Sequence, residues 1–464
     1  MAVGHRDAAP AGWPTPRGLP LLGSTLDLTR DLLGTFHRSM LEHGDAVRFV
    51  VGPPGMRTNV YAFFHPDGVQ HVLASGSGRY AKGGRVYREL TPLLGNGLLT
   101  SEGEVWRRQK RLVQPLFTRR RVGAYVGMMA EEGEQLVERW RRLHAGGAGA
   151  VDLDAQMTAL TLRVVGRALF GSDMGPVVDV LRPVVPYLSR RALRRGLVPK
   201  AVPAHWRTPG NVRADAARAR VTEVVDELVA SRRAAGADAE GEPDLLSLLL
   251  QAQDPEGGVG LDDEEVRAQV LIFLLAGHET TATSLTFTLH LIGNHPEVQE
   301  RVRAEADEVL GAGRTIGADD VLALRYTTMV VKEAMRLFPA AHSMGRISTG
   351  ADRVCGWEVP PDVAVVVSPW ATHRHPSFWE DPERFDPERF APERERERHR
   401  YAYVPFGGGP RACIGQYFSM LEAVLVTAQL VRAFRLVTDP GPVALFTGIT
   451  LRPAEPLPCR IAPR

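Results

Sequence analysis

Residues 404–416 read VPFGGGPRACIGQ. Three consecutive glycines and a proline do not fit a helix, so we expect a loop here and a helix that begins near Gly415. Backbone N–H groups at the start of that helix would face Cys413, lower the pKa of its thiol and stabilise the thiolate. The glycines at 407–409 permit a tight turn and the close approach of the backbone to something flat or bulky. Arg411 is placed to reach an anionic group on that ligand.

Other roles for Cys413 fit this loop less well. A buried structural cysteine does not need the glycines, and a nucleophilic cysteine would need a histidine base that nothing nearby in the sequence supplies. The phosphate loop Gly-x-x-x-x-Gly-Lys-Ser/Thr is absent. The loop therefore favours a cysteine that is one ligand of a large cofactor.

Composition narrows the class of protein. The 464 residues include 56 Lys and Arg against 54 Asp and Glu, a net charge of +2 that argues against a nucleic-acid binder. The three cysteines, Cys355, Cys413 and Cys459, form no disulfide scaffold, no Cys-x-x-Cys pair and no Cys-x-x-Cys-His site for haem attachment. We expect a reducing compartment.

The N-terminal residues 1–24 hold four prolines and scattered charges without an apolar core, so we expect no signal peptide. The longest apolar stretch, Val270–Gly277, is too short to span a bilayer, which predicts a cytoplasmic protein without an integral membrane segment. The segment around Trp13 and Leu19–Leu22 is interpreted as a packed arm, with peripheral membrane contact as the alternative.

A long helix is predicted from Asp262 or Asp263 to Ile292, capped by an aspartate and followed by Gly293. About 30 residues at ~1.5 Å each would give a rod of roughly 45 Å. Its middle is apolar on all faces and therefore buried, yet residues 278–281 read HETT. These residues form either a satisfied buried network or a site in the helix wall. Thr280 could bond back to the preceding turn and open a groove beside Ala276 and Gly277.

The rest of the chain is organised around helices. Strand-like alternation at 46–51 and 59–64 precedes a mainly helical region from about 100 to 340, and short strands and loops follow until a helix from about 415 to 434. No repeat or flexible linker is visible, so we expect one mainly α domain with a small β portion over residues 1–464. Its long amphipathic helices are predicted at roughly 124–144, 156–169 and 212–233.

The cysteine loop is similar to a known signature. Phe406-x-x-Gly409-x-Arg411-x-Cys413-x-Gly415 matches the haem-binding signature of the cytochromes P450 at every defined position. Further segments resemble other motifs of this family in the family's order: Trp106–Lys110, Ala276–Thr281, Glu333–Arg336 and Phe385–Phe390. The resemblance implies the P450 fold, a triangular helical domain with a long central helix and haem buried against the cysteine loop.

The resemblance also implies roles for individual residues. Cys413 would be the axial thiolate ligand of haem b, and its electron donation would favour O–O cleavage. Glu279 and Thr280 resemble the acid–alcohol pair that delivers protons to dioxygen, while Glu333, Arg336 and Arg389 resemble a buried network that locks the cysteine loop. The remaining cofactor-binding residues implied are Phe406 and Gly415 beside the ligand, Gly409, Ala276, and the propionate-binding residues Arg411, Arg346, Trp106 and Lys110.

One of these residues departs from the family pattern, and one further residue stands at a family-like position. The family position normally occupied by arginine is Lys110, which keeps the charge but loses the bidentate fork. His373 is also a family-like position, which we interpret as a packed strand histidine.

Segments that resemble the substrate-facing elements of the family are apolar and mix small with aromatic residues. This composition suggests a roomy pocket for a compact lipophile and resembles terpene-oxidising bacterial members, with fatty-acid or macrolide hydroxylation as alternatives. The predicted pocket residues are Tyr87, Leu94, Leu98, Phe273, Ala276, Ala340, Ala341, Met344 and Phe446.

The resemblance implies a monomeric monooxygenase that uses dioxygen and two electrons supplied from outside. No flavin or nicotinamide fingerprint is present, because Gly311-Ala-Gly313 follows a helix, so we expect a ferredoxin and its NAD(P)H-dependent reductase as partners. A basic surface at Arg107, Arg108, Arg111 and 119–121 would suit an acidic partner, or is simply a solvated helix face. Multi-step oxidation or coupling on the same cofactor and a non-catalytic haem sensor remain as alternatives.

Overall fold

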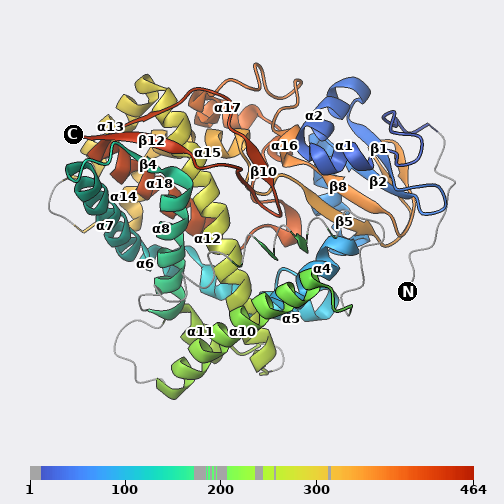
Figure 1. Ribbon diagram of the computed structural model, residues 1–464, viewed down its shortest axis with the longest axis horizontal. Helices are drawn as coiled ribbons and strands as arrows, with labels where there is room; N and C mark the ends of the chain where they lie inside the picture. The colour runs from blue at the N-terminus through green and yellow to red at the C-terminus, as the bar shows by residue number, and fades with distance from the viewer. Residues whose placement is uncertain are drawn as a thin grey trace.

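The computed structural model describes residues 12–171, 184, 187–188, 191–192, 195, 206–235, 244–254, 258–311 and 315–464. Most of these residues are helical (Figure 1). The helices are α1 Thr25–Arg30, α2 Leu32–His43, α3 Pro66–Gln70, α4 Gly84–Leu94, α5 Gly103–Val113, α6 Arg119–Ala124, α7 Val126–Ala145, α8 Leu153–Phe170, α10 Pro209–Ala235, α11 Leu245–Gln251, α12 Asp263–Asn294, α13 Pro296–Val309, α14 Ala318–Ala323, α15 Arg325–Leu337, α16 Pro369–Thr372, α17 Pro392–Glu397 and α18 Gln416–Ala433.

The strands are short and belong to several small sheets. They are β1 Ala46–Val51, β2 Thr58–Phe63, β3 Tyr80–Ala81, β4 Ala150–Asp152, β5 Met344–Ser348, β6 Asp352–Val354, β7 Trp357–Val359, β8 Ala364–Val367, β9 Phe434–Thr438, β10 Leu445–Thr447, β11 Leu451–Pro453 and β12 Pro458–Pro463. The prediction of a mainly α protein with a small β portion is confirmed.

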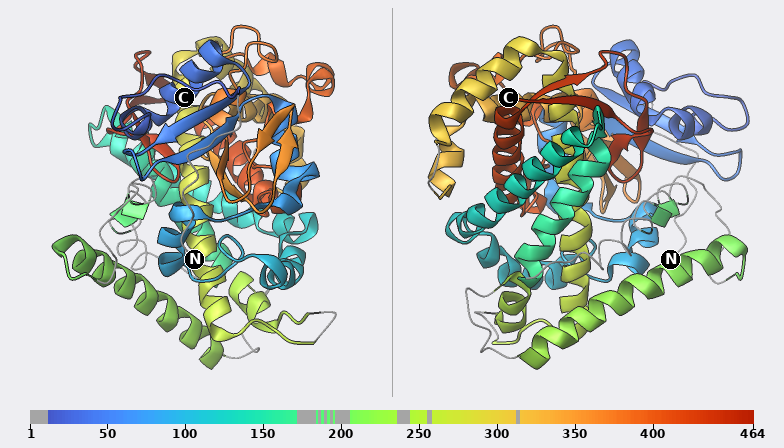
Figure 2. Two further views of the ribbon diagram at one scale, coloured as in Figure 1. Left: turned by 90° about the vertical axis from the view of Figure 1, so that its right-hand side faces the viewer. Right: turned by 60° about the vertical axis from the view of Figure 1, so that its left-hand side comes forward.

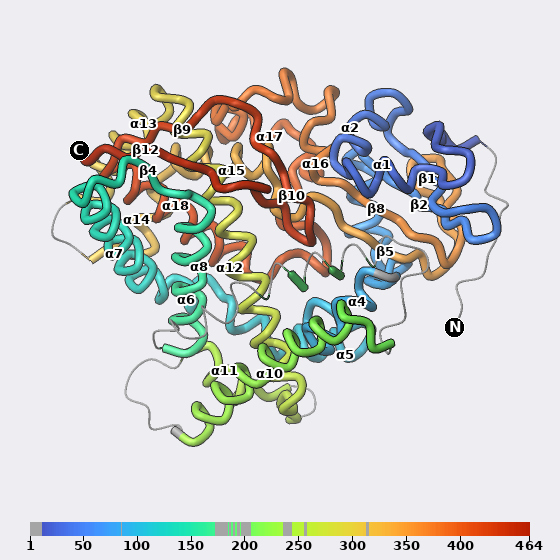
Figure 3. The backbone as a smooth tube through the Cα atoms, viewed as in Figure 1, coloured from blue at the N-terminus to red at the C-terminus, as the bar shows by residue number. Residues whose placement is uncertain are grey.

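Helix α12 runs through the middle of the molecule, beside α8 (Figures 1 and 3). It begins at a capping box, in which the Asp262 side chain accepts from the Glu265 N–H and the Glu265 side chain accepts from the Asp262 N–H. It ends at Asn294, two residues beyond the predicted end. Among the described residues, α12 is the one helix long and apolar enough to cross a membrane, and 83% of the window that meets this test is buried inside the protein.

The largest sheet stands to one side of the helices and has the strand order β1-β2-β8-β5-β3 (Figures 1 and 2). Strands β2 and β8 are parallel, while the other pairs in this sheet are antiparallel. Trp13 packs edge-on against Tyr61 of β2 and donates a hydrogen bond of 3.0 Å to the Glu358 carbonyl. The N-terminal segment from Trp13 is therefore a packed arm, although Leu19 and Leu21 stay exposed.

Two large apolar clusters surround α12. One joins it to α7, α8, α15 and α18, and the other joins it to α4, α8 and α11. The three predicted amphipathic helices correspond to α7, α8 and α10 with ends shifted by a few residues. Near its middle, α12 also meets α18, the helix that follows the cysteine loop: Thr281 of α12 donates to the Ser419 hydroxyl of α18 over 3.0 Å.

Candidate active site

The cysteine loop turns as its glycines predict. Gly407 and Gly409 adopt φ angles of 71° and 65°, in the left-handed region that favours glycine. At Gly409 a Cβ atom would lie 2.0 Å from the Leu73 carbonyl oxygen, so the backbone packs directly against the π-helical turn at 71–75. The Cys413 N–H donates to the Phe406 carbonyl over 2.9 Å, and α18 begins three residues later.

The predicted depression of the Cys413 pKa is wrong for the free thiol. Burial in the protein interior is the largest influence and raises the pKa, while hydrogen bonds from the Gly415 and Gln416 N–H groups lower it, as does the charge of Lys82. The sequence places the N–H groups correctly but does not reveal how many other segments surround the sulfur at the base of the cavity. A bound metal ion deprotonates such a thiol outright.

Cys413 opens onto a cavity of about 1600 Å³ that is partly open to the outside and also reaches the large sheet and helices α1 and α2. Its lining is mostly apolar and includes eight of the predicted substrate-pocket residues: Tyr87, Leu94, Leu98, Phe273, Ala276, Ala340, Ala341 and Met344. The prediction of a roomy apolar pocket therefore agrees with the geometry.

Phe446 is a correction. It is not among the described residues that line the cavity, whereas Gly448, Ile449 and Thr450 are. The Phe446 ring lies against Gly448, where a Cβ atom would come within 2.8 Å of its Cε1 atom. The turn of the β10–β11 hairpin thus lines the cavity, while the Phe446 ring packs against Gly448 of that turn.

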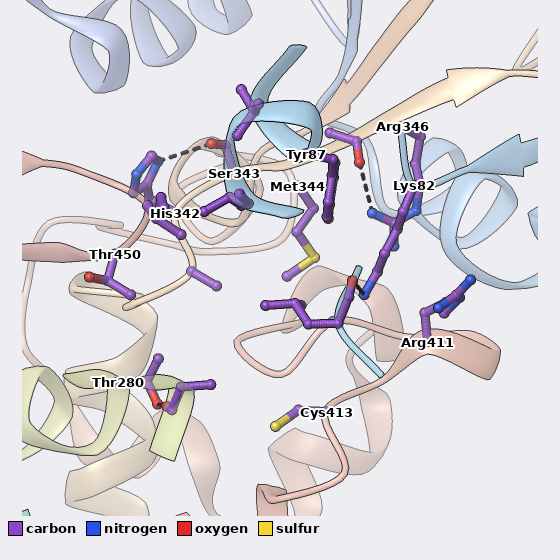
Figure 4. A pocket seen from close by; sticks show the side chains of 18 of the residues that line it. Lys82, Tyr87, Thr280, His342, Ser343, Met344, Arg346, Arg411, Cys413 and Thr450 are labelled. Atoms are coloured by element: carbon purple, nitrogen blue, oxygen red, sulfur yellow. Dashed lines mark hydrogen bonds between the residues drawn. The ribbon is translucent and has the colours of Figure 1, made fainter. Parts of the chain in front are cut away.

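Cationic side chains gather beside Cys413 at one end of the cavity (Figure 4). Arg411 pairs with Glu102 at 2.7 Å, and its guanidinium stacks 3.8 Å from the centre of the Trp106 ring. Its Nη1 atom is buried and has no hydrogen-bond partner in the described part of the chain. A buried donor of this kind is costly unless a ligand satisfies it, so this end of the cavity is suited to an anion.

Arg346 and Lys110 face the same region. Arg346 lines the cavity from β5 and donates to the Gly345 carbonyl over 2.9 Å. Lys110 donates to the Pro410 carbonyl over 2.8 Å and lies 5.2 Å from the Trp106 ring centre. Lysine at this position therefore contacts the cysteine loop itself, while its charge stays beside the cavity.

Lys82 is a cavity residue that sequence reasoning missed. Its ammonium group donates to the Leu99 carbonyl over 3.1 Å and lies close to Arg346 and Arg411. Burial and these two positive charges lower the Lys82 pKa to about 7, against the opposing influence of Glu102 and Cys413. The one hint in the sequence was the position of this lysine, between strand β3 and helix α4, whose apolar residues line the same cavity.

On the opposite wall, Thr280 bonds back along α12 as predicted, with its Oγ1 2.7 Å from the Ala276 carbonyl. The helix stays continuous, and Ala276 and Gly277 both line the cavity. Glu279 pairs with Arg452 at 3.4 Å, and the same arginine pairs with Asp154 at 3.2 Å. An acid and an alcohol thus lie next to each other at the cavity wall.

Behind the cysteine loop, Glu333 accepts two hydrogen bonds from Arg336, of 2.7 and 2.8 Å, with both side chains fully buried. Arg389 approaches the same carboxylate at 3.4 Å. His373 bridges from this cluster to the loop, because Nδ1 contacts the Arg336 carbonyl and Nε2 accepts from the Val404 N–H. His373 is packed as predicted, but it follows the short helix α16 rather than lying on a strand.

Together these residues fit a flat, anionic, metal-bearing cofactor: one sulfur ligand, an unsatisfied arginine beside it and a large apolar enclosure. The sequence profile described as Cytochrome P450 matches residues 13–456. The chain belongs to the cytochrome P450 family.

Relatives of this cytochrome P450 include several curated oxygenases. It is 38% identical to cyclooctat-9-en-7-ol 5-monooxygenase of Streptomyces melanosporofaciens, over 97% of this chain and 96% of that protein. It is 39% identical to cyclooctatin synthase of the same organism, over 92% and 90% of the two chains. Identity to the pentalenene oxygenase of Streptomyces avermitilis is 32%, over 93% and 94%.

Solved structures agree with the sequence comparison. The crystal structure of the cytochrome P450DA heme domain has a TM-score of 0.85 and 29% identity, covering 97% of this chain and 98% of that chain. The protein is therefore a cytochrome P450 monooxygenase that binds haem through the thiolate of Cys413. When bound, the haem supplies the activation of dioxygen, which the electron-donating thiolate assists. Redox partners, dioxygen and a lipophilic substrate follow from the family.

Proposed function

We propose that this P450 hydroxylates or epoxidises a cyclic terpene. The observation that carries the proposal is the lining of the cavity that Cys413 shares, where the small residues Ala276, Ala340, Ala341 and Gly448 leave room for a compact, rigid skeleton. Relatives whose names state terpene substrates, such as pentalenene oxygenase, support it.

The substrate class is tested by spectral titration of the haem-loaded enzyme. Cyclic sesquiterpenes and diterpenes are expected to displace water from the haem and shift its absorption, whereas long-chain fatty acids and macrolides are expected to do so weakly. The spectrum of the reduced, CO-bound enzyme first establishes that the thiolate ligates the iron. Tighter binding of a fatty acid or macrolide than of every terpene would overturn the terpene assignment.

The same proposal gives Thr280 and Glu279 the delivery of protons during dioxygen reduction. A hydroxyl that both donates and accepts suits a relay, and an adjoining carboxylate resupplies it. Thr280 lines the cavity, and its hydroxyl is held at the Ala276 carbonyl, with lone pairs left to accept from water or a bound ligand.

Thr280→Ala is expected to keep consuming NAD(P)H but to release peroxide in place of oxidised substrate. Thr288→Ala is the matched control, because this buried threonine on the same helix also bonds to a carbonyl four residues back. Unchanged coupling in Thr280→Ala would remove Thr280 from the proton path.

Electrons are proposed to come from a ferredoxin and its reductase in the bacterial cytoplasm. Of the predicted basic residues, Arg107, Arg108 and Arg111 have acidic partners, whereas Arg119 and Arg120 are exposed beside the start of α18, with Arg119 over the Tyr417 ring. The double charge reversal of Arg119 and Arg120 to glutamate should slow reduction and weaken its dependence on salt. The exposed Arg460→Glu variant is the control, and equal reduction rates would refute docking at α6.

A further inference from the structure

We infer that Asp352 is a positioning residue for haem: from outside the cavity, it fixes the place of Arg411 at the cationic end. The cationic end is formed by Lys82, Arg346 and Arg411, which lie on the same side of the pocket in Figure 4. Asp352 is not among the described residues that line the cavity, and it opens the β6–β7 hairpin. Its effect on the cofactor must therefore pass through other side chains.

The Asp352 carboxylate holds one segment of the chain at both ends. Its Oδ2 atom accepts from the His71 ring over 2.7 Å and from the Tyr80 hydroxyl over 2.8 Å. Its Oδ1 atom accepts from the Arg79 guanidinium. The Asp352 side chain is only 3% exposed, so these groups satisfy it in place of water. The segment from residue 71 to residue 80 is thus tied to β6 through one buried carboxylate.

This carboxylate stays charged except in strong acid. Burial alone would raise the Asp352 pKa, but the hydrogen bonds, first those from His71 and Tyr80, hold it at about 2. An ionised carboxylate only accepts hydrogen bonds, so the Nε2 atom of His71 carries the proton that it donates. Hydrogen bonds to a charged acceptor are roughly twice as strong as neutral ones. Asp352→Asn would remove the charge and turn an amide N–H₂ group toward some of these donors.

One route from Asp352 to the cysteine loop passes through His71. His71 is the first residue of the π-helical turn against which the loop packs, and a Cβ atom at Gly409 would lie 2.0 Å from the Leu73 carbonyl oxygen of this turn. Because the two backbones meet without a side chain between them, a displacement of the turn is passed on to Gly409. A shift at His71 therefore reaches Arg411, which lies two residues later in the same short 3-10 turn as Gly409.

A second route passes through Tyr80, the first residue of strand β3. This strand pairs with β5, which carries Arg346, and Lys82 follows it directly. The Lys82 N–H donates to one oxygen of Glu102 over 2.6 Å, and the other oxygen pairs with Arg411 at 2.7 Å. The position of β3 therefore sets the position of the carboxylate that holds Arg411.

Both routes end at the guanidinium of Arg411. Its buried Nη1 atom has no hydrogen-bond partner within the described ranges and is the donor that an anionic group of the haem would satisfy. Hydrogen bonds weaken steeply as their angle departs from linearity, so a small displacement of this side chain reduces the contact. Asp352 should therefore influence how long haem stays bound, and only while Arg411 is present to transmit the effect.

The experiment is a double-mutant cycle on the haem-loaded enzyme, with the rate of haem loss to excess apomyoglobin as the readout. Asp352→Asn should speed haem loss by roughly 3- to 10-fold, the range for one net hydrogen bond. In the background of Arg411→Lys, which keeps the charge but loses the fork, the same substitution should change the rate by less than about twofold. Asp31→Asn is the control and should leave the rate unchanged, because this exposed carboxylate also accepts from an arginine and from a backbone N–H but lies away from the cysteine loop.

Each outcome decides the proposal. A rate that rises in the native background and not in the Arg411→Lys background supports positioning through Arg411. An equal rise in both backgrounds, an equal rise in Asp31→Asn, or no rise at all overturns it, since Asp352 would then be merely structural or without a role in haem retention. If Asp352→Asn is isolated without haem, Asp352→Glu takes its place in the cycle, because it keeps the charge and lengthens the side chain. None of these outcomes depends on the identity of the substrate, so the proposed terpene function stands or falls separately.

Discussion

Replacing Glu333 by alanine should cost the protein its haem. The Glu333 carboxylate accepts from Arg336 Nε and Nη2 and from the Asp386 N–H at 2.9 Å, and Arg389 adds a fourth contact and a second positive charge at 3.4 Å. Alanine would leave the Arg336 charge buried without its counter-ion. Removing one partner of a buried ion pair typically destabilises the folded state by ~3–5 kcal/mol.

A destabilisation of this size is large compared with the total free energy of unfolding. Folded proteins are stable by only about 5–15 kcal/mol, so this one substitution would remove a large fraction of the free energy of unfolding. The damage should be concentrated at the cysteine loop, because Arg336 also donates to the His373 carbonyl over 3.0 Å and the His373 ring holds Val404. We therefore expect haem loss at denaturant concentrations where the native protein retains it.

The assay is haem content per polypeptide, with the CO-bound spectrum and the urea midpoint measured on the same samples. Glu333→Gln keeps the shape and one acceptor oxygen, and should give an intermediate loss in a protein that still folds. Glu395→Ala is the matched control, because this partly exposed carboxylate pairs with Lys332 on the same helix as Glu333, and such pairs near the surface contribute only about 0–1 kcal/mol. Full haem content and an unchanged urea midpoint in both Glu333 variants would refute the reasoning.

Three further variants test other parts of the site. Gly409→Ala should reduce haem retention, because a Cβ atom at this residue, whose φ is 65°, would meet the Leu73 carbonyl. Gly441→Ala is the control, because nothing lies within 4 Å of a Cβ atom there. Equal haem retention in the two variants would contradict this reasoning. Burial lowers the His373 pKa to about 3, so an unfolded chain binds a proton that the native state does not, and stability should fall as the pH drops from 6.5 towards 3. His373→Gln should flatten this acid dependence in urea titrations at several pH values, and an unaltered slope would exclude His373. Arg452→Gln removes the ion pair that holds the Glu279 carboxylate and should therefore increase the release of peroxide, whereas Arg452→Lys keeps the charge and should restore coupling. Equal peroxide yields from the native enzyme and Arg452→Gln would exclude a role of Arg452 in positioning Glu279.

Local signals in the sequence were sufficient to predict helices α7, α8, α10, α12 and α18 and the loop that carries Cys413. The capping aspartate of α12 and the glycines of the cysteine loop act through their own backbone, so their consequences are readable from a few neighbouring residues. The candidate site residues were predicted through motifs, and the structure places Cys413, Arg411, Arg346 and Thr280 around one cavity.

What was missed depends on contacts between distant segments. Lys82 acquires its low pKa from burial and from charges at residues 346 and 411, and no local pattern reports that meeting. The Cys413 pKa was predicted from nearby N–H groups, but burial by the whole protein outweighs them. Phe446 is an aromatic residue of the kind that lines such pockets, and only the folded structure shows that the neighbouring residues Gly448, Ile449 and Thr450 line the cavity instead.

The distribution of the cavity wall along the chain has a consequence for how the enzyme is made. Its lining runs from Thr25 to Thr450, and the iron ligand stands at residue 413. Strand β12 near the C-terminal end pairs with β4 at residues 150–152, so distant parts of the chain meet late. The buried apolar faces of α7 and α8 pack partly against α12, α15 and α18, so they are fully covered only after these later segments have been made. The haem-binding cavity can therefore be completed only after synthesis has passed Cys413 and Thr450.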